Sequence, residues 1–285
     1  PARTDCGHSL FFGLAGIGLA CLQLHSSGTD GPWLDRAVEC ARLLQAQAEQ
    51  DTDGVFWRQA DQINLGLAEG QAGVALFLLY LHLATGDHAW LAYGKRALDF
   101  DLSRRIDSHG HLLWHLHDGA SPSEPKTPHL WAGTAGIGSV VARYHYICPD
   151  PFYSAILDHC STTLSSRFGN KTWLAEGFSG IIEFHIDMAH LFPADGKRHL
   201  AYARHLAVAL LDHAIEIERE DFSGTAFAGV EHVRLCADLS HGTAGIALTL
   251  HRLQHGGRRQ LMLDQLLPAT CAATAASGME LADAL

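Results

Sequence analysis

Three ionisable residues stand at equivalent places in a repeated motif, each directly before a glycine: Glu69, Glu176 and His241. The imidazole of His241 could accept or donate a proton near pH 7. The carboxylates of Glu69 and Glu176 could take up a proton or orient that histidine. Each residue also has a structural interpretation, because a glutamate near a helix N-terminus is favoured by the helix dipole and a histidine there can bond to backbone. We take His241, Glu176 and Glu69 as the candidate catalytic residues.

A second candidate group lies on a loop before the third copy of the motif. It consists of His115, His117 and Asp118. Loops that are positioned by a rigid scaffold commonly carry ligand contacts, so we expect these residues and Trp131 to bind substrate. The alternative is a solvated loop without a ligand. Asp238, before the last copy, is expected to cap the inner helix rather than to act as an acid.

The motif itself is Gly-x-Ala-Gly or Gly-x-Ser-Gly followed by about a dozen mostly apolar residues, and it occurs five times. A segment of that length that is apolar on nearly every side is typical of a buried helix. The glycines permit a sharp turn and a close approach of neighbouring helices. The sequence therefore predicts a ring or stack of inner helices that begin near Gly16, Gly73, Gly136, Gly180 and Gly245.

Amphipathic segments alternate with the apolar ones, with a polar face that suits an outer layer. They predict outer helices at about 33–48, 88–102, 151–167, 196–218 and 257–276. This alternation predicts an all-α fold, an α/α toroid of inner and outer helices, as one domain over residues 1–285. Two stretches interrupt it, near 107–117 and 222–236, and are expected to form small β-hairpins on one face.

Composition and charge narrow the function. The chain has 20 basic and 31 acidic residues, a formal charge of −11. This balance argues against binding to nucleic acid. No apolar run reaches the roughly 18 residues of a membrane span, and the N-terminus lacks a signal-peptide pattern, so we expect a cytoplasmic protein without a membrane partner. A start with neither Met nor a polar leader is expected of a domain excised from a longer chain.

The cysteines and histidines do not form a recognisable metal motif. The seven cysteines include no C-x-x-C spacing, and none of the 20 histidines belongs to an H-E-x-x-H sequence. We interpret the cysteines as free thiols and the histidines as scattered surface or hydrogen-bonded residues. No metal site is predicted.

The repeats resemble a known family, the LanC-like cyclase domain of lanthipeptide synthetases. Three segments carry the resemblance: 64–73, 128–136 and in particular 235–248, Leu-Cys-Ala-Asp-Leu-Ser-His-Gly-Thr-Ala-Gly-Ile-Ala-Leu. The likeness extends over nearly the whole chain, although the five copies fall short of the seven helical hairpins that the family implies.

The resemblance implies that a cysteine thiol of a precursor peptide adds to dehydroalanine or dehydrobutyrine and forms a thioether ring. In zinc-dependent members, two Cys and one His hold a zinc ion that deprotonates the thiol. The best-matching positions here carry Trp131, Ala175 and Glu176, and an alternative alignment on Ser240-His241-Gly242 also lacks both cysteines. This departure is similar to class III synthetases, whose cyclase domain follows lyase and kinase-like domains on one chain. The resemblance thus implies no zinc cofactor, a dehydrated precursor peptide as partner, lanthionine or also labionin rings, and proton transfer by side chains.

Two other functions remain open. The domain could be a module that binds the precursor peptide, or forms a homodimer, while rings close with little chemical help. It could also be a carbohydrate-active toroid, which needs two carboxylates that face each other across the centre, with Glu69 and Glu176 as the candidates.

Overall fold

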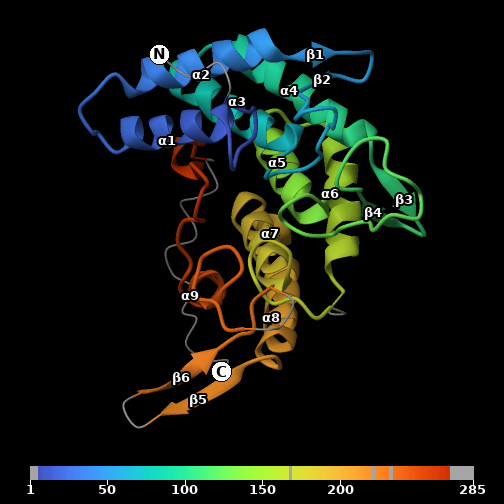
Figure 1. The fold of residues 1–285 in the computed structure, drawn as a ribbon, viewed down its shortest axis with the longest axis vertical. Helices are drawn as coiled ribbons and strands as arrows, with labels where there is room; N and C mark the ends of the chain where they lie inside the picture. Colours follow the sequence, from blue (N-terminus) through green and yellow to red (C-terminus); the bar gives the residue numbers. More distant parts are fainter. Residues whose placement is uncertain (1–5, 167–168, 220–221, 231–233, 270–285) are drawn as a thin grey trace.

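The computed structural model describes residues 6–166, 169–219, 222–230 and 234–269. Within them the chain forms helical hairpins arranged around a common centre (Figure 1). Helices that begin at the glycine motifs form the inner layer, namely α1 (Leu14–Ser26), α3 (Gln71–Thr85), α5 (Thr134–Ile147), α7 (Phe178–Leu191) and α9 (Thr243–His255). The outer layer consists of α2 (Trp33–Gln47), α4 (His88–Ser103), α6 (Pro151–Leu164) and α8 (Gly196–Leu211). The predicted α/α toroid is confirmed.

The inner helices α3, α5 and α7 are buried along most of their length because their sequences are mostly apolar, whereas α1 and α9 are partly exposed. In α3, every side chain from Gln71 to His82 is buried. The outer helices bury one side only, and two of them start at aspartate caps: the carboxylate of Asp87 accepts the amide of Ala89 at 2.9 Å, and that of Asp150 accepts the amide of Phe152 at 2.8 Å. None of the helices formed by the described residues is long and apolar enough to cross a bilayer.

A leucine and a glycine join each inner helix to the next. A methyl group added at Gly180 would lie 2.7 Å from Cβ of Leu130, which belongs to the preceding repeat. Since real Cβ atoms do not approach so closely, only glycine permits this contact. The same relationship links Leu10 with Gly73, Leu67 with Gly136, and Leu174 with Gly245. The second glycine of the motif therefore serves packing between repeats.

The strands form three two-stranded antiparallel hairpins at the ends of the helical pairs. They are β1 (Glu49–Gln50) with β2 (Val55–Phe56), β3 (Ile106–Ser108) with β4 (His111–Leu113), and β5 (Ile215–Arg219) with β6 (Phe222–Ala226). The hairpin near 107–117 was predicted, and the second predicted one lies earlier than expected because its first strand is β5. The hairpin of β1 and β2 was not predicted, since its strands are only two residues long.

The inner helices begin where they were predicted, two residues before the second glycine of each motif, and the first glycine is the N-cap. The bounds of two predicted outer helices were wrong. The outer helix expected over 196–218 ends at Leu211 because the following residues pair as β5. No outer helix covers α9 between residues 257 and 269, where the described chain has only the 3-10 turn η3 (Asp264–Leu266). The remainder of that prediction, 270–276, lies outside the described residues.

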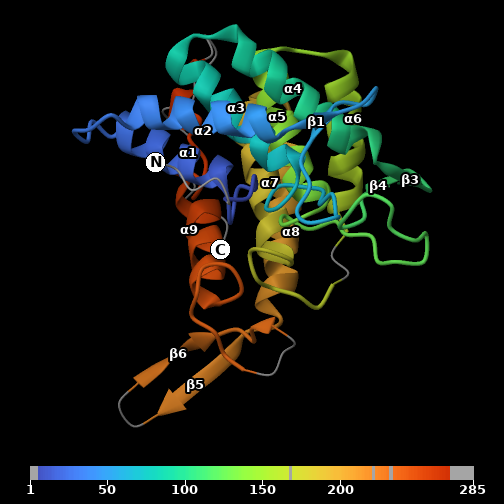
Figure 2. The same ribbon diagram turned by 45° about the horizontal axis from the view of Figure 1, so that its top comes forward.

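The segment after α9 takes a different path. Residues 256–267, which we call the strap, run from the end of α9 toward α1 and α3 (Figures 1 and 2). Neighbouring inner helices pack in the order α1, α3, α5, α7, α9, and the strap passes through the gap between the first and the last. It lines a groove against Gly16 and Leu19 of α1. The strap thus supplies one wall of the toroid's interior.

Candidate functional site

A chain of backbone hydrogen bonds joins the loops that precede the inner helices. Each bond uses the residue two positions before the first glycine of its motif, hereafter position −2. The amide of Phe11 donates to Ala68 (3.0 Å), that of Ala68 to Trp131 (2.8 Å), that of Trp131 to Ala175 (2.9 Å) and that of Ala175 to Ser240 (3.0 Å). The five loops therefore lie side by side and form a mouth at one end of the inner helices.

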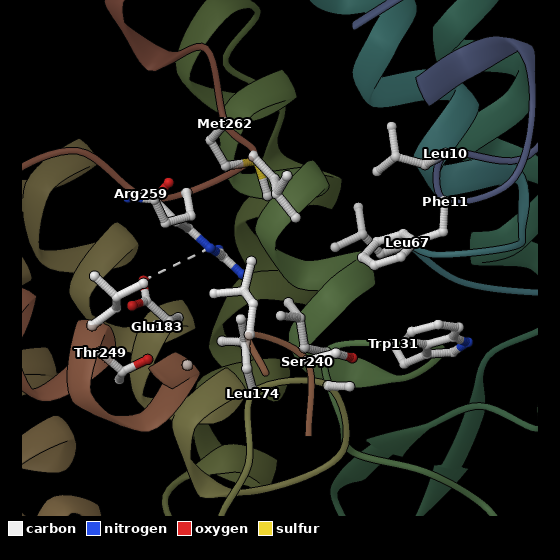
Figure 3. Close-up of a pocket in the computed structure, with 17 residues that line it drawn as sticks. Leu10, Phe11, Leu67, Trp131, Leu174, Glu183, Ser240, Thr249, Arg259 and Met262 are labelled. Carbon is white, nitrogen blue, oxygen red and sulfur yellow. Dashed lines mark ion pairs between the residues drawn. The ribbon is translucent and has the colours of Figure 1, made fainter. Parts of the chain in front are cut away.

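A cavity of about 90 Å³ lies inside this mouth (Figure 3). Leucines at position −3 make up much of its wall, namely Leu10, Leu67, Leu130, Leu174 and Leu239. Position −2 contributes Phe11, Trp131, Ala175 and Ser240. The opposite wall comes from the strap through Arg259, Gln260, Leu261 and Met262. The lining is mainly apolar, and its few polar groups are therefore the ones that can orient a ligand.

The buried or half-buried polar groups of the wall are Glu183 on α7, Thr249 on α9, Ser240 before α9, and Arg259 on the strap (Figure 3), and the strap adds the exposed amide of Gln260. Arg259 is anchored by neighbouring carboxylates: its Nη1 donates to Asp187, and its Nε lies 3.8 Å from Glu183. Its Nη1 also donates to Ser139 Oγ at 3.0 Å. The guanidinium is thus held at the cavity with its charge compensated.

These carboxylates belong to a buried ionic network behind the cavity. Arg143 on α5 lies 2.9 Å from Asp187 on α7 and 2.6 Å from Asp264 on the strap. Arg252 on α9 bonds to Asp187 at 2.8 Å and pairs with Glu183. Burial opposes ionisation of Asp187, but Arg143, Arg259 and Arg252 together hold its pKa well below the usual range. Burial raises the pKa of Glu183, in spite of the same arginines. The network ties the strap and three inner helices together.

His241 stands at the mouth between two tryptophans. Its ring centroid is 6.3 Å from that of Trp131 and 6.2 Å from that of Trp173. Its amide donates to the carboxylate of Asp238 at 2.8 Å. The expectation that Asp238 caps α9 was wrong: its carboxylate stabilises the turn before the helix, and the N-cap is Gly242, without a side-chain cap. The imidazole is half-buried in an aromatic environment.

The two candidate glutamates are held separately. Glu176 pairs with Lys171 at 2.9 Å, and its loop adjoins that of His241 through the bond between Ala175 and Ser240. Glu69 accepts from Asn64 Nδ2 at 3.2 Å on the loop of the second repeat. Two further loops separate it from that of His241, so the structure brings only Glu176 into the neighbourhood of the histidine.

The residues directly before the first glycine of each motif, which include the three candidate catalytic residues, lie outside the cavity wall. None of Phe12, Glu69, Ala132, Glu176 and His241 lines the cavity, and Phe12 is 67% exposed. The chain turns sharply at this point, because the first amide of α1, α5, α7 and α9 donates to a carbonyl seven residues earlier. An example is the 2.8 Å bond from the amide of Leu14 to the carbonyl of Gly7. This turn directs positions −3 and −2 inward and leaves position −1 on the rim.

The loop candidates have local partners. His117 Nε2 lies 3.2 Å from Glu124, and Asp118 accepts from Arg104 at 3.1 Å. His115 Nδ1 is 3.3 Å from the carbonyl of Pro125. The loop also pairs with the second repeat, since Leu65 donates to Leu116 at 2.9 Å. These three residues therefore flank the mouth without lining the cavity, whereas Trp131, also predicted to bind substrate, is part of its wall.

The sequence analysis missed Glu183, Ser240, Thr249 and Arg259 as cavity residues. One signal was available: Glu183 and Asp187 are charged residues in an otherwise apolar helix, and such residues are almost never buried unless paired. Arg259 could not be found in this way, because it was expected on an outer helix, whereas the described residues 257–269 form none.

Comparisons with known proteins agree with this architecture. A family model described as "Lanthionine synthetase C-like protein" matches residues 7–267. The "Probable SapB synthase" of Streptomyces coelicolor is 31% identical over 185 residues, which are 65% of this chain and 19% of that protein. Among solved structures, nisin cyclase is similar in fold with a TM-score of 0.59 and 16% identity, over 91% of this chain and 66% of its own. The chain thus spans about a fifth of the first relative and just under two thirds of the second.

Proposed function

The chain belongs to the lanthionine synthetase C-like family, and from that premise we propose that it closes thioether rings in a dehydrated precursor peptide. The thiol of a peptide cysteine adds to the double bond of a dehydroalanine or dehydrobutyrine residue. The S–H bond breaks, a bond forms between sulfur and the β-carbon, and the α-carbon gains a proton. The observation that supports the proposal best is the mouth, where His241 lies between two tryptophans next to an apolar cavity.

His241 is the residue that we assign to proton transfer. A free thiol has a pKa of about 8.5, so only a small fraction is thiolate at neutral pH and a base is needed. An imidazole can accept the thiol proton and then return a proton to the α-carbon. Glu176 lies on the adjoining loop, and its carboxylate could orient the imidazole or return a proton to it. We assign Glu69 no role in proton transfer, because two further loops separate it from the loop of His241.

The residues at the zinc positions of the family do not fit a zinc ion. A catalytic zinc needs three protein ligands and an open fourth position. Trp131 offers an indole, Ala175 a methyl group and Glu176 a carboxylate that already pairs with Lys171. Among the described residues, no three His, Cys, Asp or Glu side chains come together as a metal site. We therefore propose side-chain proton transfer without zinc, and with it a cyclase of the class III type that works with kinase-like and lyase domains.

The direct test is ring formation by the purified chain on a peptide that was dehydrated beforehand. Addition of the thiol leaves the peptide mass unchanged, so the assay should count free thiols with an alkylating reagent and locate rings by fragmentation. We expect thiols to disappear faster than in buffer, with the chelator EDTA present throughout. A rate equal to that in buffer would refute the cyclase assignment.

A second candidate function is supported by the cavity lining. Neither His241 nor Glu176 contributes to it, and Phe11 and Phe12 at the mouth are 38% and 67% exposed. These features suit a module that binds apolar residues of a precursor peptide while the rings close elsewhere or unaided. Tight peptide binding without any acceleration of ring closure would favour this candidate.

A further inference from the structure

Three polar atoms of the cavity wall have no hydrogen-bond partner within the described part of the chain. They are Ser240 Oγ, Thr249 Oγ1 and Arg259 Nη2. The side chain of Arg259 is 4% exposed, and Thr249 is 1% exposed. Buried polar groups are nearly always bonded, because an unmade hydrogen bond leaves the cost of desolvation uncompensated. Three such atoms around one cavity therefore indicate that something else completes them.

The three atoms come from three separate elements that the fold brings together. Ser240 ends the chain of hydrogen-bonded loops, Thr249 lies on the second turn of α9, and Arg259 reaches in from the strap (Figure 3). Asp187 and Ser139 engage Nη1 of Arg259, which fixes the plane of the guanidinium and leaves Nη2 for a ligand.

The unsatisfied groups specify the chemistry of that ligand. Arginine nitrogens can only donate hydrogen bonds, and the two hydroxyls can donate as well. Glu183, the one carboxylate of the wall, is already engaged by Arg252. The rest of the lining is mainly apolar, apart from the exposed amide of Gln260. A ligand that fits this site has an acceptor oxygen attached to a small apolar group. The cavity volume of about 90 Å³ also exceeds the roughly 10–15 Å³ that a single water molecule needs.

We propose that Arg259, Thr249 and Ser240 form an oxyanion site for the carbonyl oxygen of the dehydroamino acid under attack. This inference rests on the proposed cyclase function and adds a group that the mouth residues do not supply. When the thiolate adds to the β-carbon, the electron pair of the double bond moves through the α-carbon to the carbonyl oxygen and gives an enolate. The enolate collapses when the α-carbon takes a proton, so no oxidant or reductant is needed.

The physical advantage lies in the moment at which charge develops. Donors that are fixed in a site shielded from water stabilise a developing oxyanion far more than solvent would, and they need no reorganisation. Here the arginine is held by carboxylates, and the hydroxyls are held by α9 and by the hydrogen-bonded loop before it, so the geometry exists before the substrate arrives. The site acts on the transition state and leaves binding of the ground state nearly unchanged.

Two conservative variants separate this role from a structural one. Thr249→Val keeps the shape of the side chain and removes a hydroxyl that is unsatisfied in the fold, and Ser240→Ala does the same before α9. Neither should lower the melting temperature, because no hydrogen bond of the fold is lost. Each should reduce kcat for ring closure about tenfold or more while KM changes less than about twofold.

Matched controls come from hydroxyls outside the cavity. Thr163 Oγ1 accepts the amide of Leu112 at 2.8 Å, and Ser161 Oγ donates to Leu157 at 2.7 Å. Thr163→Val should lower the melting temperature yet leave kcat unchanged, which is the opposite signature. Arg259→Lys retains the charge beside Asp187 but not the fork of donors, and it should slow ring closure more than either hydroxyl variant.

The outcomes distinguish failure of the oxyanion site from failure of the proposed cyclase function. If the unaltered chain closes rings and Thr249→Val and Ser240→Ala match its kcat within about twofold, the oxyanion site is refuted and the cyclase function stands. If Thr163→Val slows ring closure as much as Thr249→Val, the effect is structural and the site is again refuted. If the unaltered chain closes no rings, the cyclase function and the site fall together.

Discussion

The amide of Ala175 donates a 3.0 Å hydrogen bond to the carbonyl of Ser240. This bond joins the fourth and fifth repeats and sets two loops of different chemistry edge to edge. One carries Glu176 with its lysine partner, and the other carries His241 with the unsatisfied hydroxyl of Ser240. Because the same bond recurs between the other neighbouring loops, the position of a residue relative to its glycine determines whether it faces the cavity or the rim.

The first prediction concerns the packing of the inner helices. Gly180→Ala should lower the free energy of unfolding by about 1–3 kcal/mol, because the new methyl group would lie 2.3 Å from the carbonyl oxygen of Leu174 and 2.7 Å from Cβ of Leu130. Urea denaturation measures the change. Gly7→Ala is the control, since no atom lies within 4 Å of the added carbon. Equal stability of the two variants would contradict the packing argument.

The second prediction concerns the anchor of the strap. Asp264→Asn should destabilise the chain by about 2–3 kcal/mol, because Arg143 is buried and loses the carboxylate at 2.6 Å, while Asp187 remains to compensate its charge. Asp158→Asn removes an exposed carboxylate 3.8 Å from Arg198 and should change stability little. The midpoints of urea denaturation compare the two, and a loss of the same size in both would show that the strap is not anchored by this pair.

The third prediction is loss of stability in mild acid. Burial lowers the pKa of five histidines: that of His8, His129 and His199 to about 4, that of His185 to about 3, and that of His190 below its usual value. An unfolded histidine titrates near 6.5, so between about pH 6.5 and 4 the unfolded chain binds more protons than the folded one. The contribution of these histidines to the free energy of unfolding is therefore fully present above pH 6.5. It is lost as the pH drops, by about 1.4 kcal/mol per pH unit for each histidine. Asp101, whose pKa burial raises to about 7, opposes part of this loss.

A difference measurement isolates one histidine pair in this effect. Nδ1 of His185 and Nδ1 of His199 are 3.0 Å apart between α7 and α8. In His199→Gln the decline in unfolding free energy between pH 7.5 and pH 5 should be shallower than in the unaltered chain. His25→Gln, at an exposed position, should leave the slope as it was. If the unfolding free energy of His199→Gln changed with pH as steeply as that of the unaltered chain, this histidine pair would not be a source of the acid sensitivity.

The fourth prediction concerns proton transfer at the mouth. His241→Ala should slow ring closure about a hundredfold, within the range that a general acid or base contributes, at a melting temperature close to that of the unaltered chain. The pH–rate profile should lose the limb that reports the histidine. Ring closure at an undiminished rate would move us to the peptide-binding alternative.

The fifth prediction concerns metal content. Elemental analysis after dialysis against a mild chelator should find far less than one zinc per chain, with ring closure retained, because the zinc positions carry Trp131, Ala175 and Glu176. One zinc per chain, with activity lost on its removal, would contradict the ligand assignment.

The sequence alone was sufficient to predict the toroid. Glycines such as Gly136 and Gly180, each followed by an apolar run, leave a buried helix as the only arrangement that hides so much apolar surface and allows so close an approach. The spacing of apolar residues along a segment shows which face of that helix is buried, and this information is contained in the segment itself.

Only the tertiary structure decided which side chains meet in the cavity. The turn before each inner helix directs positions −3 and −2 inward, a choice made by backbone hydrogen bonds between Phe11, Trp131 and the other loops that no single-repeat pattern encodes. Arg259 arrives on a strap whose path depends on ion pairs with distant carboxylates. Periodicity cannot foresee such contacts, because the free energy that holds the strap comes from residues up to 184 positions away, as in the bond from Tyr80 to Asp264.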